Sequence, residues 1–212
     1  MKLELYAHGK INLGLDVIGE RPDGYHEVKM IMQTVEVCDR LEFEDIDEDE
    51  IQLKSDAAFL PLDGDNLICK ACRLMKDEYD IKKGVRISLE KHIPVAAGMA
   101  GGSADAAAAL VAMNEIFALG LSRDRLMELG VKLGADVPYC IMKGTALSEG
   151  IGEKLTELAP MPDCYILIAK PGISVSTKEA YGGLVLDEHT LHPDIDGMVE
   201  AIKAGDLKGV TD

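Results

Sequence analysis

The chain has 212 residues and a formal net charge of −16, with 47% hydrophobic and 28% charged residues. This length is enough for a substantial hydrophobic core in one or two domains, and the composition is ordinary for a globular protein. The negative charge would repel a nucleic-acid backbone, and the apolar runs are too short to span a membrane. The first residues alternate like a strand and do not resemble a signal peptide. We therefore expect a cytoplasmic protein, monomeric or homodimeric, without nucleic-acid or membrane partners.

Residues 2–54 are predicted to form β-strands. Apolar residues alternate with polar or small ones from Ile11 to Val17, and the runs "MIMQTVEV" and "DRLEFED" follow. A turn at "RPDG", residues 21–24, separates two of the strands. The acidic run at residues 42–50 is interpreted as the solvated end of a hairpin.

Two pairs of polar residues lie at the starts of these strands. The alternation places Lys10 and Asn12 on one face, where they are either solvated or hold a substrate hydroxyl or phosphate. Tyr25 and His26 follow the turn, and they could offer a ring for stacking and a polar edge to a nucleobase. A half-buried strand start explains the second pair equally well.

A helix is predicted over residues 66–79, with Asp65 or Asn66 as its N-cap. It contains Cys69 and Cys72, whose spacing we interpret as chance helical spacing, because no second cysteine pair is available to bind zinc. The five cysteines of the chain are scattered and suggest no disulfide framework.

A glycine-rich loop follows a predicted strand at residues 85–90. The sequence from residue 94 reads "PVAAGMAGGSADAA", in which Gly98, Gly101 and Gly102 can adopt backbone angles that other residues avoid. A glycine loop that opens a helix can bind a phosphate through its backbone N–H groups and the helix dipole. The alternative is a tight turn whose small residues serve close packing, and the residues alone do not decide between the two.

The helix behind this loop is predicted to begin at a Ser103 N-cap and to end at Gly120. Asp105 lies in its first turn, where the helix dipole favours a negative charge. A carboxylate there would repel a bare phosphate but would suit a Mg²⁺ ion that bridges to it.

Asp136 lies in "LGADVPYC", two residues before a proline that favours an extended Val137. An aspartate in such a position could accept the proton of a hydroxyl that attacks a phosphoryl group, or it could form a local turn. The other predicted elements of this half are a helix from the Ser122 N-cap to Gly134, strands around 139–149 and 164–169, and helices within 174–183 and 192–205.

Four stretches together resemble the GHMP kinases, a family named for galactokinase, homoserine kinase, mevalonate kinase and phosphomevalonate kinase. They are "AHGKINLGLDVIGERPDGYHE", "IPVAAGMAGGSADAA", "LGADVPYC" and "GTALSEGIGE", in the family's order. The second is similar to the ATP loop of many members. The first is more specific, and it resembles the branch that phosphorylates the 2-hydroxyl of a CDP-linked methylerythritol in the non-mevalonate (MEP) route to isoprenoid precursors.

This resemblance implies roles for individual residues. Asp136 would be the catalytic base and Lys10 its partner, while Asn12 would hold the substrate hydroxyl. Tyr25 would stack on cytosine, His26 would hydrogen-bond it, and Tyr181 would cover the other face of the ring. Either Ser103 or Asp105 would contact Mg²⁺. The ATP phosphates would be bound by Pro94, Val95, Ala96, Ala97, Gly98, Met99, Ala100, Gly101, Gly102, Ser103 and Ala104.

The resemblance also implies an α+β, two-domain GHMP kinase fold. The first domain, residues 1–155, would be similar to ribosomal protein S5 domain 2, and the second, residues 156–212, would be an incomplete ferredoxin-like domain. Ala100 and Ala104 stand where many members have glycine and serine. The family's third glycine-rich motif, with G-S-G, is absent from this sequence, and we therefore expect a C-terminally truncated chain.

Two alternatives stay open at this point. One is another GHMP kinase that acts on a small alcohol such as mevalonate or homoserine, for which an aromatic cytosine site would have no purpose. The other is a catalytically inactive nucleotide-binding relative, which the missing third motif favours and the presence of Lys10 and Asp136 opposes.

Overall fold

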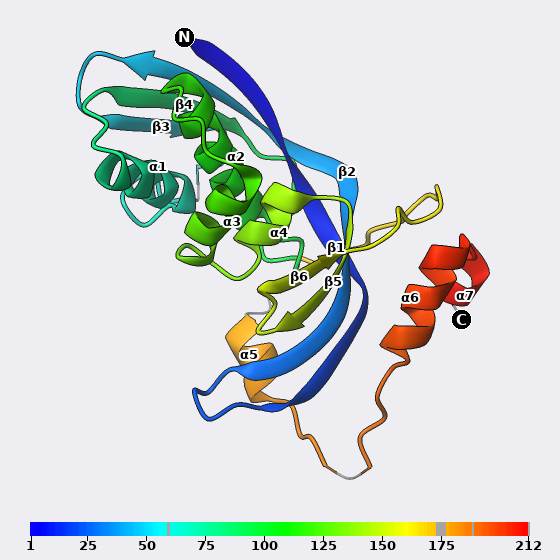
Figure 1. Ribbon diagram of the computed structural model, residues 1–212. Helices are drawn as coiled ribbons and strands as arrows, with labels where there is room; N and C mark the ends of the chain where they lie inside the picture. The colour runs from blue at the N-terminus through cyan, green and yellow to red at the C-terminus, as the bar shows by residue number, and fades with distance from the viewer. Residues whose placement is uncertain (59, 173–176, 188, 212) are drawn as a thin grey trace. The chain divides into compact units, whose positions relative to one another are not determined.

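The computed structural model describes residues 1–58, 60–172, 177–187 and 189–211 (Figure 1). The chain divides into two compact units, each made of separate segments. This division differs from the predicted sequential domains 1–155 and 156–212, which stay a prediction. The first unit comprises Met1–Gly9, Val35–Pro94 and Ala100–Met142, and the second comprises Lys10–Thr34, Val95–Met99 and Lys143–Asp212.

Two long strands, β1 (Lys2–Glu20) and β2 (His26–Ile46), pair with each other and contribute to both units. In the first unit, β4 (Gly84–Glu90) pairs antiparallel with β2 and parallel with β3 (Ile51–Ser55). The prediction of strands over residues 2–54 is confirmed. The prediction of a hairpin end at residues 42–50 is wrong. Because β4 lies between β2 and β3, the acidic run leads from β2 to a strand with which it does not pair.

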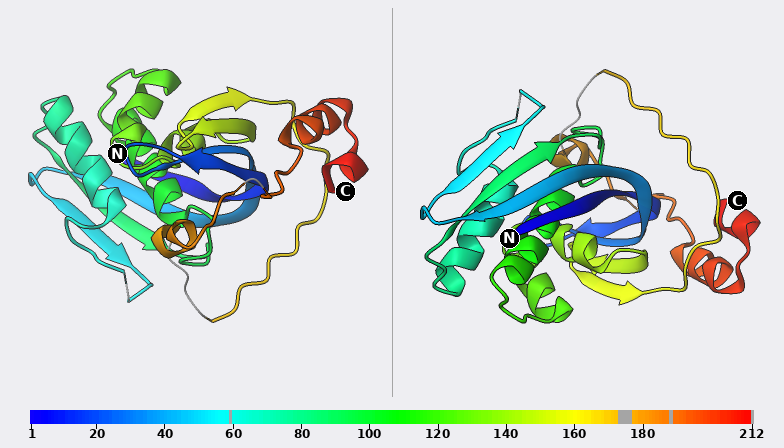
Figure 2. Two further views of the ribbon diagram at one scale, coloured as in Figure 1. Left: turned by 90° about the horizontal axis from the view of Figure 1, so that it is seen from below. Right: turned by 90° about the horizontal axis from the view of Figure 1, so that it is seen from above.

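Helices of the first unit lie on one face of these strands (Figures 1 and 2). They are α1 (Leu67–Glu78), α2 (Gly101–Ile116), α3 (Arg123–Val131) and α4 (Val137–Met142). The predicted caps are confirmed where Asn66 Oδ1 accepts from the N–H of Ile68, and Ser122 Oγ from that of Arg125.

The core of the first unit consists of the buried residues of α1 and α2 and of the strands β2 and β4. Most of α2 is buried, and its run of alanines allows neighbouring backbones to approach closely. Cys69 and Cys72 lie on the buried face of α1, and burial raises the pKa of both thiols. A buried thiol with a raised pKa is less reactive, which favours a packing role for this pair.

The second unit contains the first half of β2, which pairs antiparallel with β5 (Thr145–Gly150), and β5 pairs in turn with β6 (Lys154–Glu157). Its helices are α5 (Thr177–Gly182), α6 (Ile195–Ala204) and α7 (Leu207–Thr211). The buried residues that form its core are Ile31, Ile195, Val199, Ile202 and Val210.

The helices predicted within 174–183 and 192–205 correspond to α5 and α6, although residues 174–176 lie outside the described residues. Asp194 caps α6 by accepting from the N–H of Gly197. Within the part of the chain that the structure describes, no helix combines the length and the apolar character needed to cross a membrane.

The strand predicted around 139–149 is wrong in its first half, because α4 occupies Val137–Met142 and only β5 is a strand. The extended conformation predicted for Val137 is likewise wrong. Pro138 lies in the first turn of α4, where its missing N–H would have no partner within the helix, so proline is tolerated there.

The strand predicted at 164–169 is also wrong. Residues 158–172 contain no helix or strand in the described structure, and the side chains of Tyr165 and Leu167 are fully exposed. The sequence has the alternation of a strand, but a strand is stabilised by hydrogen bonds to a neighbour that this segment does not have in the described part of the chain.

We predict that this exposed segment promotes aggregation of the 212-residue chain, because it combines β-propensity with exposed apolar side chains. Replacing Tyr165 and Leu167 together by glutamate should slow aggregation on heating, as measured by light scattering. The control is Val131→Glu, which changes an isolated exposed apolar residue at the end of α3 and should have little effect on aggregation. Equal aggregation of the double variant and the unchanged chain would contradict the prediction.

Candidate active site

The glycine-rich loop has an unusual backbone between β4 and α2. Ala96, Gly98 and Ala100 have φ values of 54°, 69° and 54°, so every second residue is in the left-handed region. Such alternation turns successive N–H groups toward a common concave side that can bind an anion. A residue with a β-carbon is disfavoured there by about 1–2 kcal/mol. The loop therefore carries backbone strain at Ala96 and Ala100, which glycine at these positions would avoid.

The helix α2 begins at Gly101, and its N-cap is Ala100, whose methyl side chain can accept no hydrogen bond. The prediction of Ser103 as the N-cap is therefore wrong, and Ser103 lies, partly buried, in the first turn. The helix thus begins directly from the left-handed loop, and no side chain caps its first N–H groups.

Both interpretations of the glycines apply, at different positions. A β-carbon on Gly101 would lie 3.1 Å from Cγ2 of Ile93 and 3.2 Å from Nζ of Lys91, so this glycine is needed for close packing. A β-carbon on Gly98 would meet open space in the described structure, but φ at that residue is 69°. Gly98 therefore serves the shape of the loop.

Lys10 and Asn12 are adjacent, as the strand alternation predicts. Nζ of Lys10 donates to Oδ1 of Asn12 at 3.1 Å, and the Lys10 side chain is buried, with the residue only 6% exposed. The backbone N–H of Lys10 also donates to the carbonyl of Met99 at 3.0 Å. Within the second unit, this bond joins the candidate catalytic strand to the glycine-rich loop.

Asp136 lies in the first unit, immediately before α4, and is partly buried. Its backbone carbonyl accepts from the N–H of Cys140 at 3.1 Å, so the main chain fixes the residue independently of its carboxylate. The predicted pairing with Lys10 of the second unit stays a prediction.

A buried ionic cluster of Asp39, Lys91 and Asp105 lies beside α2. Nζ of Lys91 contacts a carboxylate oxygen of Asp39 and, at 2.8 Å, Oδ2 of Asp105. The side chains are 0%, 7% and 5% exposed, in that order. Burial raises the pKa of Asp105, although Lys91 opposes this shift; burial lowers the pKa of Lys91, but the two carboxylates outweigh it and raise that pKa overall.

The cluster bears on the predicted Mg²⁺ contact. The lysine ammonium already occupies one oxygen of Asp105, and a second cation there would be repelled. Among the described residues, no group of three or more histidine, cysteine, aspartate or glutamate side chains could hold a metal. The arrangement therefore does not favour Asp105 as a metal ligand, and a Mg²⁺ contact at Ser103 stays a prediction.

Sequence reasoning missed Asp39 and Lys91, which are separated by 52 residues along the chain. The available signal was weak. Lys91 directly follows the predicted strand and precedes the loop, and Asp39 interrupts an otherwise β-like run.

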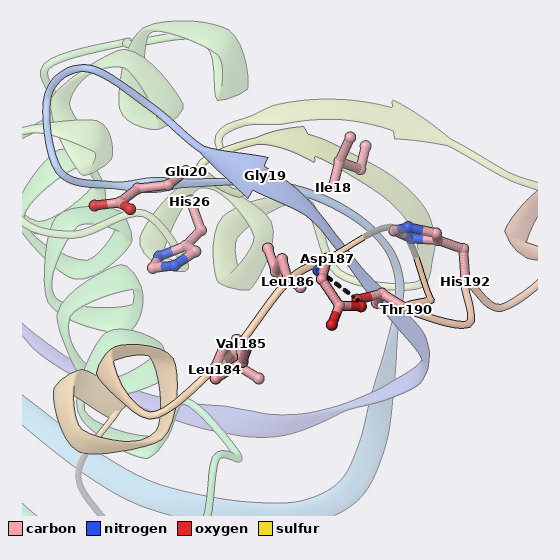
Figure 3. Close-up of a pocket in the computed structure, with 10 residues that line it drawn as sticks. All are labelled: Ile18, Gly19, Glu20, His26, Leu184, Val185, Leu186, Asp187, Thr190 and His192. Atoms are coloured by element: carbon pink, nitrogen blue, oxygen red, sulfur yellow. Dashed lines mark hydrogen bonds between the residues drawn. The ribbon is translucent and has the colours of Figure 1, made fainter.

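A pocket of about 580 Å³ lies in the second unit at the ends of β1 and β2, where residues 184–187, Thr190 and His192 also line it (Figure 3). His26 lines it, and the rings of His26 and Tyr181 lie 5.2 Å apart at 45°. Tyr25 directly precedes His26 in the sequence and is 60% exposed, and its backbone N–H donates to Asp23 of the preceding turn. The structure thus brings His26 and Tyr181 together and leaves the Tyr25 ring available for contact.

Two polar contacts near this pocket were not predicted. The backbone N–H of Asp187 donates to Oγ1 of Thr190 at 2.9 Å, a contact that Figure 3 draws, and Nδ1 of His192 lies 2.7 Å from Oδ1 of Asp16. The first pair joins two residues that line the pocket, and the second joins the lining residue His192 to β1. Nothing in the local sequence pattern indicates the second pair.

The sequence profile of the GHMP kinases N terminal domain matches residues 66–144, which include the glycine-rich loop and Asp136. A 4-diphosphocytidyl-2-C-methyl-D-erythritol kinase of Lachnoclostridium phytofermentans is 58% identical over 205 residues, which cover 97% of this chain and 70% of that protein. The chain belongs to the GHMP kinase family. A relative of the same name from Bacillus cytotoxicus is 51% identical over 99% of the chain and 72% of its own length.

Solved structures of GHMP kinases agree with this fold. The crystal structure of a 4-(cytidine 5'-diphospho)-2C-methyl-D-erythritol kinase has a TM-score of 0.77 and 31% identity, over 96% of this chain and 72% of that one. Homoserine kinase from Cytophaga hutchinsonii has a TM-score of 0.72 at 17% identity, over 99% and 70% of the two chains, which shows the shared fold alone. The predicted α+β GHMP kinase fold is confirmed.

Proposed function

We propose that the protein transfers the γ-phosphate of ATP to the 2-hydroxyl of 4-(cytidine 5'-diphospho)-2-C-methyl-D-erythritol, in the MEP route to isoprenoid precursors. The observation that carries this proposal is the identity of 50% to 58% with relatives named for that substrate, over at least 97% of the chain. The alternating left-handed loop before α2 and the ring pair of His26 and Tyr181 support it independently.

The glycine-rich loop, from Pro94 to Ala104, would bind the ATP phosphates through its backbone N–H groups. Phosphoryl transfer needs positioning and charge stabilisation more than covalent chemistry, so a concave set of N–H groups at a helix N-terminus suits it. Mg²⁺ bound with the nucleotide would neutralise phosphate charge, and Ser103 is the residue that we propose beside it.

Asp136 would accept the proton of the attacking hydroxyl, and Lys10 would favour the ionised state of the base or hydroxyl. Asn12 would orient the hydroxyl, and its hydrogen bond with Lys10 supports a shared task. Because the Lys10 backbone also bonds to Met99, an ATP molecule on the loop and a hydroxyl at Lys10 would be held by one connected piece of structure.

The assay that tests the proposal supplies radiolabelled γ-ATP with the CDP-methylerythritol, mevalonate and homoserine in parallel. We expect transfer to the cytidine compound alone. Transfer to mevalonate or homoserine would instead support another GHMP small-alcohol kinase. Nucleotide binding without transfer to any acceptor would support a catalytically inactive relative, so either result would overturn the proposal.

Tyr25→Ala should weaken binding of the cytidine substrate by about 1–3 kcal/mol, the size of base–aromatic stacking elsewhere. The predicted reason is the loss of one face of the cytosine site, with His26 and Tyr181 left in place. The measurement is the KM of the cytidine substrate, with Tyr6→Ala, an exposed tyrosine of β1, as the control. An equal loss for an analogue that lacks the base would refute the stacking role.

A further inference from the structure

The segment that enters the glycine-rich loop is held by a single buried carboxylate. Oδ1 of Asp39 accepts from the backbone N–H groups of His92 and Ile93, at 2.6 and 2.8 Å. These are the last two residues before Pro94, where the loop begins. Asp39 is fully buried, so water cannot replace it as the partner of these N–H groups.

The segment that leaves the loop is held by the same cluster. Asp105, the fifth residue of α2, receives a hydrogen bond from Nζ of Lys91, and this ammonium also pairs with Asp39. The Lys91 ammonium additionally lies 3.2 Å from the position of a β-carbon on Gly101, the first residue of α2. One cation therefore joins the entry and the exit of the loop.

Burying the charged groups of this cluster costs desolvation free energy, so the cluster is an inefficient way to stabilise a fold. It contains two carboxylates for one ammonium, and Oδ1 of Asp105 is buried without a hydrogen-bond partner in the described structure. Buried ion pairs often contribute less to stability than apolar side chains of similar size. The loop between its ends carries backbone strain at Ala96 and Ala100, and such strain persists only where the surroundings impose it.

We propose that Asp39, Lys91 and Asp105 are positioning residues that hold both ends of the glycine-rich loop in its phosphate-binding shape before ATP arrives. This inference rests on the proposed function and adds the residues that preorganise its nucleotide site. Without the cluster, the loop must become ordered when ATP binds, and the ordering weakens ATP affinity. The second substrate, which the loop is not proposed to contact, is unaffected.

The test measures ATP binding by titration calorimetry and the KM values of both substrates. Asp105→Ala, which releases the exit end, should raise the ATP dissociation constant about tenfold, with little change in melting temperature and in the KM of the cytidine compound. Asp105→Asn, which keeps one oxygen for Lys91, should recover most of the affinity. Asp39→Asn should also weaken ATP binding. The double variant of Asp39→Asn and Asp105→Ala should lose less binding free energy than the two single variants added together, because both changes break one cluster.

The matched control is Asn114→Ala. Asn114 holds the loop at the other end of α2 by accepting from the N–H of Leu121 and donating to its carbonyl, so this change costs stability without touching the glycine-rich loop. The ATP affinity of the Asn114→Ala variant should be unchanged. Asp105 variants that bind ATP like the unaltered protein would overturn the positioning role, as would an affinity loss that disappears in metal-free buffer. If the unaltered protein fails to bind ATP, the proposed function itself is wrong. If Asp39→Asn does not fold, the Asp105→Ala variant alone still tests the positioning role.

Discussion

Asp136→Asn should lower kcat by about 10²–10⁴-fold with little change in ATP affinity, because it removes the proposed proton acceptor and leaves the glycine-rich loop intact. The substitution preserves size, and the bonds that fix this part of the chain come from the backbone of residue 136. A loss of folding is therefore not the expected cause. Single-turnover transfer and ATP titration on the same preparation measure the two quantities separately.

The control for this prediction is Asp124→Asn, an exposed aspartate in the first turn of α3 in the same unit. It removes the same charge and should leave kcat unchanged. Lys10→Met should lower kcat in the same direction as Asp136→Asn, since the two residues are proposed to act on one proton. An unchanged kcat in Asp136→Asn would refute the assignment of Asp136 as the catalytic base, whatever the result for Lys10→Met.

Elements whose signals are local could be predicted from the sequence. The caps at Asn66 and Ser122 satisfy N–H groups only two or three residues away, so the residue type and its position are enough to find the helix start. The contact of Lys10 with Asn12 is local in the same sense, because it follows from the two-residue period of a strand.

Features that depend on distant partners could not be predicted in this way. The acidic run at residues 42–50 has the polarity of a hairpin end, but the pairing of β2 with β4, which comes after α1, decides its structure. The segment at 164–169 has a strand's alternation but lacks a neighbouring strand in the described structure. In both cases the sequence indicates a preference, and the tertiary partner determines the result.

The helix start at α2 shows how a local rule can fail at a candidate functional site. Ser103 has the ideal side chain for an N-cap, and yet Ala100 takes that position in a left-handed conformation. A serine cap would satisfy the N–H groups that a phosphate is proposed to bind. The departure from the rule is thus consistent with an anion site, and it was visible only once the φ values were known.

Lys91→Met should lower the free energy of unfolding by about 3–5 kcal/mol, the usual cost of removing one partner from a buried ion pair. Methionine fills a similar volume, so the loss comes mainly from the two buried carboxylates that remain without a cation. Urea denaturation followed by circular dichroism measures it. Lys82→Met is the control, because Lys82 pairs with Asp80 at the surface and such exposed pairs contribute about 0–1 kcal/mol.

A second substitution separates the charge imbalance from lost packing. Adding Asp105→Leu to Lys91→Met removes one of the two uncompensated carboxylates and its unpartnered oxygen, so the double variant should be more stable than Lys91→Met alone. If the double variant is no more stable, the cost of Lys91→Met lies in packing and the electrostatic argument is wrong. If the double variant recovers stability but binds ATP weakly, apolar side chains can replace the cluster in supporting the fold but cannot hold the glycine-rich loop. The positioning role requires this separation of stability from ATP affinity.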